Sequence, residues 1–219
     1  MALTMPKGSQ FGFAPIIKGS NAKITAIANA KPGTVTYDQG ATQPPDDAVI
    51  LVKASGWPLL NNKVCRLGPN DELLGIDTSD TDLFPAAGFG IAETLTAGEF
   101  VDFTQQGDPS TSGGEQQFWT GQLLEDPLGR QISMPTFKNA KTMTIPLYYD
   151  PSEPWYDAAK KIDIKGEAVV LRNKLANGDV LYYYGYLSFD GDPSIQSNTP
   201  MGNTATFTII GESTLVRKA

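Results

Sequence analysis

The chain has 219 residues, of which 40% are hydrophobic and 19% charged, and its formal net charge is −7. This length and composition fit a globular protein with a substantial core, and no basic stripe is present that would favour tight binding to nucleic-acid phosphates. The single cysteine excludes an internal disulfide, and the lack of histidine removes the most common general base and metal ligand.

Residues 1–23 carry apolar side chains among glycines and prolines, in a pattern too irregular for a helix. We expect an extended N-terminal arm that docks on another surface, with no place in a sheet for residues 11–17. The sequence starts without the basic and apolar regions of a signal peptide, and no apolar run approaches the ~20 residues that a bilayer requires. These features predict a soluble, unexported protein without a membrane partner.

Residues 24–98 consist of short β-rich runs separated by turns, which is typical of a small barrel or roll. The loop at 40–47 contains Pro44-Pro45 and is expected at the surface. We therefore expect a small β module here, with strands at 24–27, 34–37, 48–53, 63–67 and 72–76.

The composition changes near residue 98, where we place the start of a second β domain, residues 99–219. Residues 100–103 alternate as a strand, and residues 105–117 are so rich in glycine, serine and proline that they predict a long flexible loop. A strand at 118–124 and a turn at 126–129 follow, and the chain from Arg130 leads towards the next strand.

Residues 142–149 alternate apolar and polar side chains, which predicts a strand with one packed face. A short helix is expected next, with Asp150 as its cap, Pro151 in the first turn and Glu153 completing a capping box. Four apolar residues at helical spacing then form one stripe, which we expect to dock the helix on the sheet: Trp155, Ala158, Ala159 and Ile162.

Two β-rich runs, 168–175 and 180–189, flank Asn177-Gly178, a strong signal for a β-hairpin. Residues 190–200 are expected to form a polar loop, residues 204–210 a closing strand and residues 212–219 a short polar tail. The predicted fold class is mainly β, with an antiparallel β-sandwich or barrel core, one short flanking α-helix and a small β-barrel-like module.

Few residues in this chain favour catalysis. Cys65 lies in an alternating run and is interpreted as a packed thiol. The carboxylates at 77, 80 and 82 and at 190 and 192 lack the pattern of a calcium loop, and Glu125-Asp126 cannot act as a glycosidase pair because neighbouring strand residues face opposite sides. The tyrosine row at 182–189 fits a strand packed on both faces, with a stacking platform for sugars or bases as the alternative. We predict no catalytic residue, metal site or cofactor.

The C-terminal half resembles the tail tube proteins of long-tailed (siphovirus-type) bacteriophages. The order and spacing of its motifs carry this resemblance: 131–143, 149–156, 168–175, the Asn177-Gly178-Asp179 turn, 182–189 and 204–210.

Residues 24–90 resemble a small β module of many phage virion proteins, above all at 55–61 and 74–77. That module is similar to a half-domain of ubiquitin-activating enzymes, and the resemblance implies its fold without ubiquitin chemistry. The module's usual Gly-Val-Val-Thr element is altered here to Gly33-Thr34-Val35-Thr36, and its His-Gly element is replaced by an insertion without histidine.

The resemblance implies a structural virion protein, not an enzyme, that forms hexameric rings stacked into the tail tube. Its partners would be further copies of itself, other tail proteins such as the tape measure and terminator, and double-stranded DNA that passes through an acidic lumen without specific binding. It would be made in the host bacterial cytoplasm and located in the virion tail. We expect the small module to decorate the outside of the tube.

Two segments are candidates for contacts between rings, because they are apolar or flexible and have no evident strand: Phe11, Phe13, Ile16 and Ile17 in the arm, and Gly107, Asp108, Pro109, Gly113 and Gly114 in the loop. Alternative functions are a tail terminator or connector that stops at one ring, a glycan-binding β-sandwich that uses the tyrosine row, and a hydrolase built on carboxylates alone.

Overall fold

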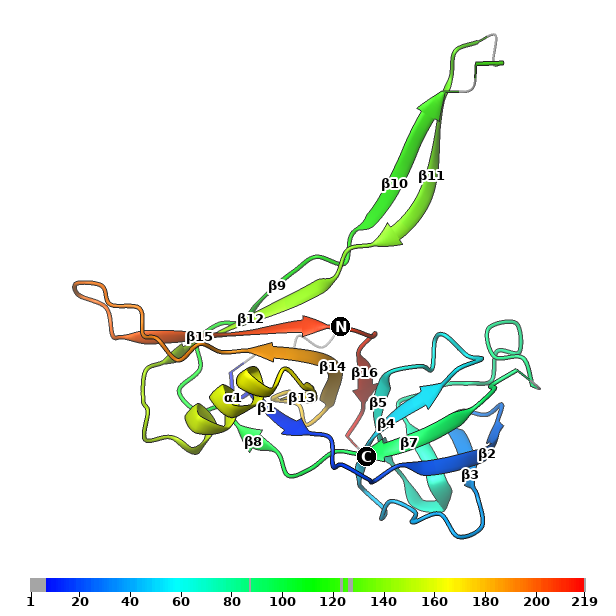
Figure 1. Cartoon of the computed structure of the whole chain (residues 1–219), viewed down its shortest axis with the longest axis horizontal. Helices are drawn as coiled ribbons and strands as arrows, with labels where there is room; N and C mark the ends of the chain where they lie inside the picture. Colours follow the sequence, from blue (N-terminus) through cyan, green and yellow to red (C-terminus); the bar gives the residue numbers. More distant parts are fainter. Residues whose placement is uncertain (1–6, 87, 123, 126–127, 219) are drawn as a thin grey trace.

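The computed structural model describes residues 7–86, 88–122, 124–125 and 128–218. These residues form a large antiparallel sheet with one helix, a closed barrel beside it, and a hairpin that stands away from both (Figure 1). The predicted fold class, mainly β with one short helix and a small barrel, is confirmed.

The large sheet brings together strands from both ends of the chain. Its path begins at the two-residue strand β8 and ends at the three-residue strand β9, so both edges are short, and β16 (Thr214–Val216) adds to one end of β14. In spatial order the strands are β8 (Val101–Asp102), β1 (Gln10–Pro15), β13 (Ala168–Lys174), β14 (Val180–Ser188), β15 (Gly202–Ile209), β12 (Lys141–Tyr148) and β9 (Ser110–Ser112).

The predicted period-two strand and hairpin are confirmed in this sheet. Met143, Ile145 and Leu147 of β12 are buried, and Met143 and Ile145 lie opposite Phe207 and Ala205 of β15. Strand β13 pairs along its whole length with residues 180–186 of β14, around the Asn177-Gly178 turn. Burial of every second residue along β12 and β15 gives these strands one apolar face, whereas β13 and β14 are buried on both faces.

Helix α1 (Pro154–Lys165) covers this face. Trp155 and Ala159 are fully buried in the core between helix and sheet, Ile162 is 9% exposed, and Ala158 packs at its margin. The Trp155 ring lies 5.7 Å from both the Phe103 and Phe189 rings. The apolar stripe of the helix thus packs against aromatic side chains of the sheet and its flanking segments.

The predicted helix start is wrong by one turn. Pro154 is the first helical residue and Glu153 occupies the cap position without a side-chain hydrogen bond. Asp150 instead closes the preceding turn, where its carboxylate accepts hydrogen bonds from the Ser152 backbone N–H (3.0 Å) and hydroxyl (2.6 Å). An Asp side chain can satisfy a turn as well as a helix end, so the same sequence signal fits both.

Residues of the small β module form a closed six-stranded barrel in the order β2-β3-β6-β5-β4-β7. Its core centres on Trp57 and Leu60, which are fully buried together with Cys65. The sixth strand, β7, was not predicted. The strands are β2 (Ala22–Ala28), β3 (Gly33–Tyr37), β4 (Val49–Ala54), β5 (Lys63–Leu67), β6 (Glu72–Leu74) and β7 (Ala92–Thr96), with the 3-10 turn η1 (Pro69–Asp71) before β6.

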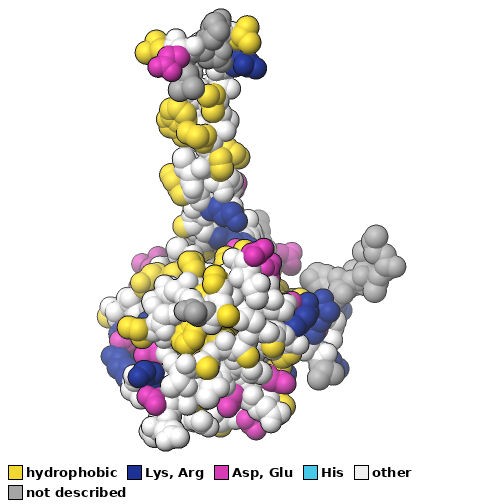
Figure 2. Space-filling model, turned by 90° about the vertical axis from the view of Figure 1, so that its right-hand side faces the viewer, with side chains coloured by type: hydrophobic (Ala, Val, Ile, Leu, Met, Phe, Trp, Pro, Cys, Tyr) yellow, Lys and Arg dark blue, Asp and Glu magenta, His cyan; other side chains and the backbone are white. Residues whose placement is uncertain are grey.

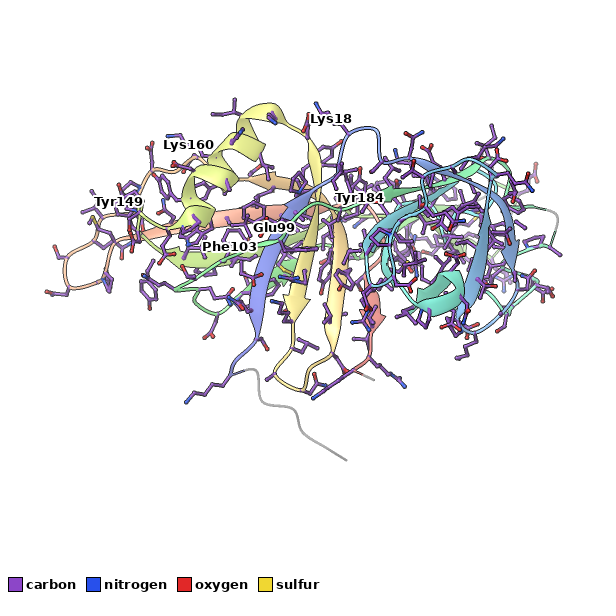
Figure 3. All side chains as sticks on the ribbon, turned by 90° about the horizontal axis from the view of Figure 1, so that it is seen from below. Lys18, Glu99, Phe103, Tyr149, Lys160 and Tyr184 are labelled. Carbon is purple, nitrogen blue, oxygen red and sulfur yellow. The ribbon has the colours of Figure 1, made fainter. Side chains whose placement is uncertain are left out.

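A third core joins the barrel to the second face of the sheet. Leu51 and Val64 of the barrel pack with Val170, Tyr182 and Val216 of the large sheet. Tyr184 lies at the margin of the same cluster, near the boundary between sheet and barrel in Figure 3. The barrel and the sheet therefore share buried surface.

Two expectations about the ends of the chain are wrong. Residues 11–17 were expected outside any sheet, but Gln10–Pro15 form β1, which pairs with β13 from Gln10↔Lys174 to Pro15↔Val169. The polar tail contains β16, whose Val216 is buried between sheet and barrel. Strand β1 pairs with β13, and β16 pairs with β14. These partners are distant in sequence, and local periodicity does not reveal such long-range pairing.

Candidate assembly surface

A two-stranded hairpin, β10 (Gln116–Gln122) and β11 (Gln131–Lys138), rises from the body beyond β9 and β12 (Figure 1). Its strands pair with each other from Phe118↔Pro135 to Gln122↔Gln131, and their extensive contacts are with each other. Every residue of β11 is exposed to solvent. The hairpin is therefore a protruding arm that the described part of its own chain leaves uncovered.

The arm is apolar where a free surface is expected to be polar. Figure 2 shows hydrophobic side chains distributed along it. Five large ones are exposed on its two strands: Phe118 at 57%, Trp119 at 48%, Ile132 at 36%, Met134 at 52% and Phe137 at 65%. No Asp, Glu, Lys or Arg occurs at 116–122 or 131–137.

An isolated hairpin of this kind is at best marginally stable in water, and exposed, uncharged β-strands promote aggregation. The described chain carries no apolar cover for the arm. The physical expectation is that another chain covers it, so we define the arm (residues 116–138) as the candidate assembly surface.

The base of the arm is fixed by local geometry. Gly113 has φ +81°, and a Cβ at this position would collide with the carbonyl oxygen of Ala140. Gly114 has φ +85° but faces open space. A groove of about 1020 Å³ lies beside this base, lined also by Pro58 and Leu59 of the barrel and Tyr186 of the sheet. Glycine at 113 therefore lets the chain turn from the sheet edge into the arm.

The predicted flexible loop at 105–117 is largely ordered along the edge of β12. Gly107 N–H donates to Pro146 O at 2.8 Å, and residues 110–112 pair with 142–144 as β9. Asp108 and Pro109 are exposed on this segment. The expectation of a free loop is wrong. Strand β9 lies at the edge of the sheet with its side chains in solvent, so it needs no apolar residues and its sequence looks like that of a loop.

The candidate residues of the N-terminal segment lie elsewhere. Phe11 and Phe13 are buried in the core under α1, Ile16 packs at the margin of the core shared with the barrel, and Ile17 is 48% exposed. The structure thus does not bring this segment together with the 107–114 segment as one surface, and of its four candidates Ile17 is the exposed one.

The tyrosine row does not form a stacking platform. Tyr182 and Tyr183 are buried on opposite faces of β14, Phe189 is buried in the helix-covered core, and Tyr186 is 48% exposed. Burial raises the pKa of the Tyr182 and Tyr183 phenols. The interpretation of a strand packed on both faces is confirmed.

Other candidate groups have local structural partners. Cys65 is fully buried in the barrel, and burial raises the pKa of its thiol. Asp77 pairs with Lys31 at 2.7 Å, and the hydrogen bond from this lysine is the main cause that lowers the Asp77 pKa. The turn at 126–129 and the pair Glu125-Asp126 lie partly outside the described residues.

One charged cluster stabilises the β8 edge of the sheet. Arg172 donates to Asp102 at 2.7 Å, Lys174 donates to its other oxygen at 3.0 Å, and the Arg172 guanidinium lies 4.0 Å from the centre of the Phe100 ring. Burial raises the pKa of Asp102, but the hydrogen bonds from Arg172 and Lys174 outweigh burial and hold it below its usual range. The cluster fastens β8 to β13 across β1.

In the described part of the chain, no three His, Cys, Asp or Glu side chains are grouped so that they could hold a metal ion. No helix among these residues is long and apolar enough to cross a membrane.

The described residues thus form a β-rich body with an exposed apolar arm, which is a surface suited to association with other chains. A family model described as phage tail tube protein matches residues 55–218, about three quarters of the chain. The chain belongs to this family and is a structural protein of a phage tail. The resemblance inferred from the sequence is confirmed at the level of the tail tube family.

Two solved structures are similar to part of the chain. One is the tail of an empty gene transfer agent particle computed with C6 symmetry, with a TM-score of 0.41 and 12% identity over 55% of this chain and 88% of that one. The other is the virion of a native gene transfer agent particle, with a TM-score of 0.39 and 11% identity over 54% and 89%. No curated protein matches the sequence.

Proposed function

We propose that this chain assembles into hexameric rings that stack to form the tail tube, the conduit through which DNA leaves the capsid. Membership of the tail tube family, over a region that includes the whole arm, supports this proposal. The observation that carries it is the arm itself, whose aromatic side chains stay about half or more exposed among the described residues. In a tube, neighbouring copies provide that cover.

The sheet edges support a particular mode of assembly. Residues 105–112 hydrogen bond along β12, and β8 lies beside β1 at the other edge, so little edge of the long strands is free to pair with another chain. Lateral pairing between the edges of these long strands is therefore a poor basis for ring closure. We assign the main contacts between copies to the arm.

The remaining parts of the proposal follow from charge and topology. A net charge of −7 favours a lumen that repels phosphates within about one Debye length, roughly 8 Å at physiological ionic strength, so DNA passes without adhering. The barrel closes on itself and leaves no open sheet edge among its described strands. We therefore propose that it decorates the outside of the tube. The tape measure protein and the terminator are the expected partners inside and at the end of the tube.

Removal of the arm tests the proposal. The Asn139 N–H donates to Glu115 O at 3.0 Å, so these residues already face each other across the base and can be joined by an Asn-Gly turn in place of residues 116–138. We expect a folded chain that stays monomeric where the full chain forms tubes. Ile91→Thr is the matched control, because Ile91 is 80% exposed on the barrel.

Tubes formed by the arm-deleted chain at the normal rate would contradict the assignment of the main contacts to the arm. Single rings formed by the full chain would favour the alternative, a terminator or connector of the tail.

A further inference from the structure

The strand β16 meets the barrel at a cleft of about 550 Å³. Strand β16 lies between the large sheet and the barrel (Figure 1), and residues 215–217 line the cleft from this side. Barrel residues 31–32 and 74–77, together with Arg66, line it from the other side. A molecule bound here would therefore contact both the barrel and a strand of the large sheet.

Aliphatic side chains line the cleft from both sides. Leu74 and Ile76 belong to the barrel, and Leu215, which is 39% exposed, belongs to β16. At Gly75 the barrel comes so close to β16 that a Cβ would lie 2.5 Å from the Leu215 carbonyl oxygen. This spacing leaves no room for another strand, since paired strands lie about 4.8 Å apart. The cleft can therefore hold side chains of a partner, but not an added strand.

Two arginines give the cleft a positive charge. Lys31 pairs with Asp77 at 2.7 Å, so these two charges offset each other, whereas the lining has no second carboxylate for Arg66 and Arg217. The Asp47 carboxylate, outside the lining, lies 3.6 Å from the buried Arg66 Nε, which has no hydrogen-bond partner in the described part of the chain. The Arg66 side chain is 34% exposed and Arg217 is exposed, so both can offer N–H donors to a ligand.

This lining favours an acid that has an apolar neighbour. Guanidinium groups bind carboxylates through paired hydrogen bonds, and burial of an aliphatic group beside the acid adds stability. We propose that the cleft binds an acidic side chain of another protein, together with an aliphatic residue next to it in that chain. The acid pairs with Arg66 and Arg217, and the aliphatic group packs on Leu74 and Leu215.

The charge of the whole chain makes this cleft selective. With a net charge of −7, the chain repels acidic partners over most of its surface, so a positive cleft is where such a partner is attracted. The chain belongs to a structural family, which makes another protein the natural source of the carboxylate. This inference goes beyond the proposed function and requires neither rings nor tubes.

Binding of short peptides to the full chain tests the inference. Saturation-transfer difference NMR detects the peptide signals, so it works with single chains and with large assemblies. The probe is acetyl-Leu-Asp-Leu-amide, and its matched controls are acetyl-Leu-Asn-Leu-amide, which lacks the charge, and acetyl-Gly-Asp-Gly-amide, which lacks the aliphatic groups. Hexanoate is a fourth probe for a free aliphatic acid. Each is titrated to millimolar concentration.

We expect the Leu-Asp-Leu peptide to bind about tenfold more tightly than either peptide control, because an ionised acceptor strengthens the hydrogen bonds from arginine. Arg66→Gln and Arg217→Gln should each weaken its binding by about tenfold. Lys160→Gln is the control, because Lys160 is an exposed cation of α1, away from the cleft (Figure 3), and it should leave binding unchanged. Unchanged melting temperatures show that the variants are folded, and Arg217→Gln, at an exposed site, keeps the test valid if Arg66→Gln unfolds.

Three results would overturn the inference. The first is the absence of binding, or equal binding of the Asp and Asn peptides. The second is binding that survives both arginine substitutions, which would place the peptide elsewhere, such as on the exposed arm. The third is hexanoate binding as tight as that of the Leu-Asp-Leu peptide and equally dependent on the arginines, which would identify a free acid as the ligand. None of these results bears on whether the chain forms tubes.

Discussion

Replacement of Trp155 tests whether the helix is held on the sheet by its apolar stripe. The Trp155 side chain is fully buried against Phe103 and Phe189, and its indole N–H donates to the Thr104 hydroxyl at 2.9 Å. Trp155→Ala removes the ring and leaves a cavity, for which a loss of about 3 to 5 kcal/mol in the free energy of unfolding is expected. Thr104 is partly exposed, so water can replace its lost partner at little further cost.

For a chain of this size each kcal/mol shifts the melting temperature by about 2 to 4 °C, so the expected decrease is about 6 to 20 °C. Differential scanning calorimetry on the monomer measures it. Trp119→Ala is the matched control, because Trp119 is half exposed on the arm and its loss should leave the melting temperature of the body nearly unchanged. Equal effects of the two substitutions, or no effect of Trp155→Ala, would refute the packing of the helix described above.

Three further predictions concern the arm, the sheet edge and the barrel. Gly113→Ala should slow tube formation measured by light scattering far more than Gly114→Ala, because only the Cβ at 113 would collide with the Ala140 carbonyl; equal rates would contradict this geometry. Because the folded-state pKa of Asp102 is lowered, its stabilising contribution is present above about pH 4 and is lost as the pH falls through the folded value. Asp102→Asn should therefore reduce the decrease in the free energy of unfolding that urea denaturation shows as the pH is lowered through this range. Asp108→Asn, at an exposed site, should leave this decrease unchanged. Cys65 should react with iodoacetamide only on unfolding, because its complete burial and raised pKa suppress the thiolate. As a control, a cysteine introduced by Thr120→Cys at an exposed position of the arm should react at once. Rapid labelling of Cys65 in the native protein would show that the barrel core opens.

Hydrophobic periodicity predicted the strands and the helix that bury only one face. Met143, Ile145 and Leu147 alternate because only one face of β12 is covered, and Trp155, Ala159 and Ile162 recur at helical spacing because α1 covers that face. Strand β1 escaped prediction because both of its faces are buried, Phe13 towards the helix and Ala14 towards the barrel, which removes the alternation.

The arm was predicted only in part. A strand at 118–124 and the following turn were expected, but β11 was interpreted as a lead into β12. The signal that could have identified an interface was the pair Phe118-Trp119 together with Ile132 and Met134, which lie in two runs without charged residues, 116–122 and 131–137. This signal is ambiguous in sequence because buried core strands carry the same pattern, and only the structure shows that the arm has no core to enter.

Electron microscopy of the concentrated, purified chain tests the central claim most directly. We predict hollow tubes built from stacked rings, with six subunits in each ring and every arm buried between copies. A protein that remains monomeric at high concentration, or rings in which the arms stay exposed to solvent, would contradict it.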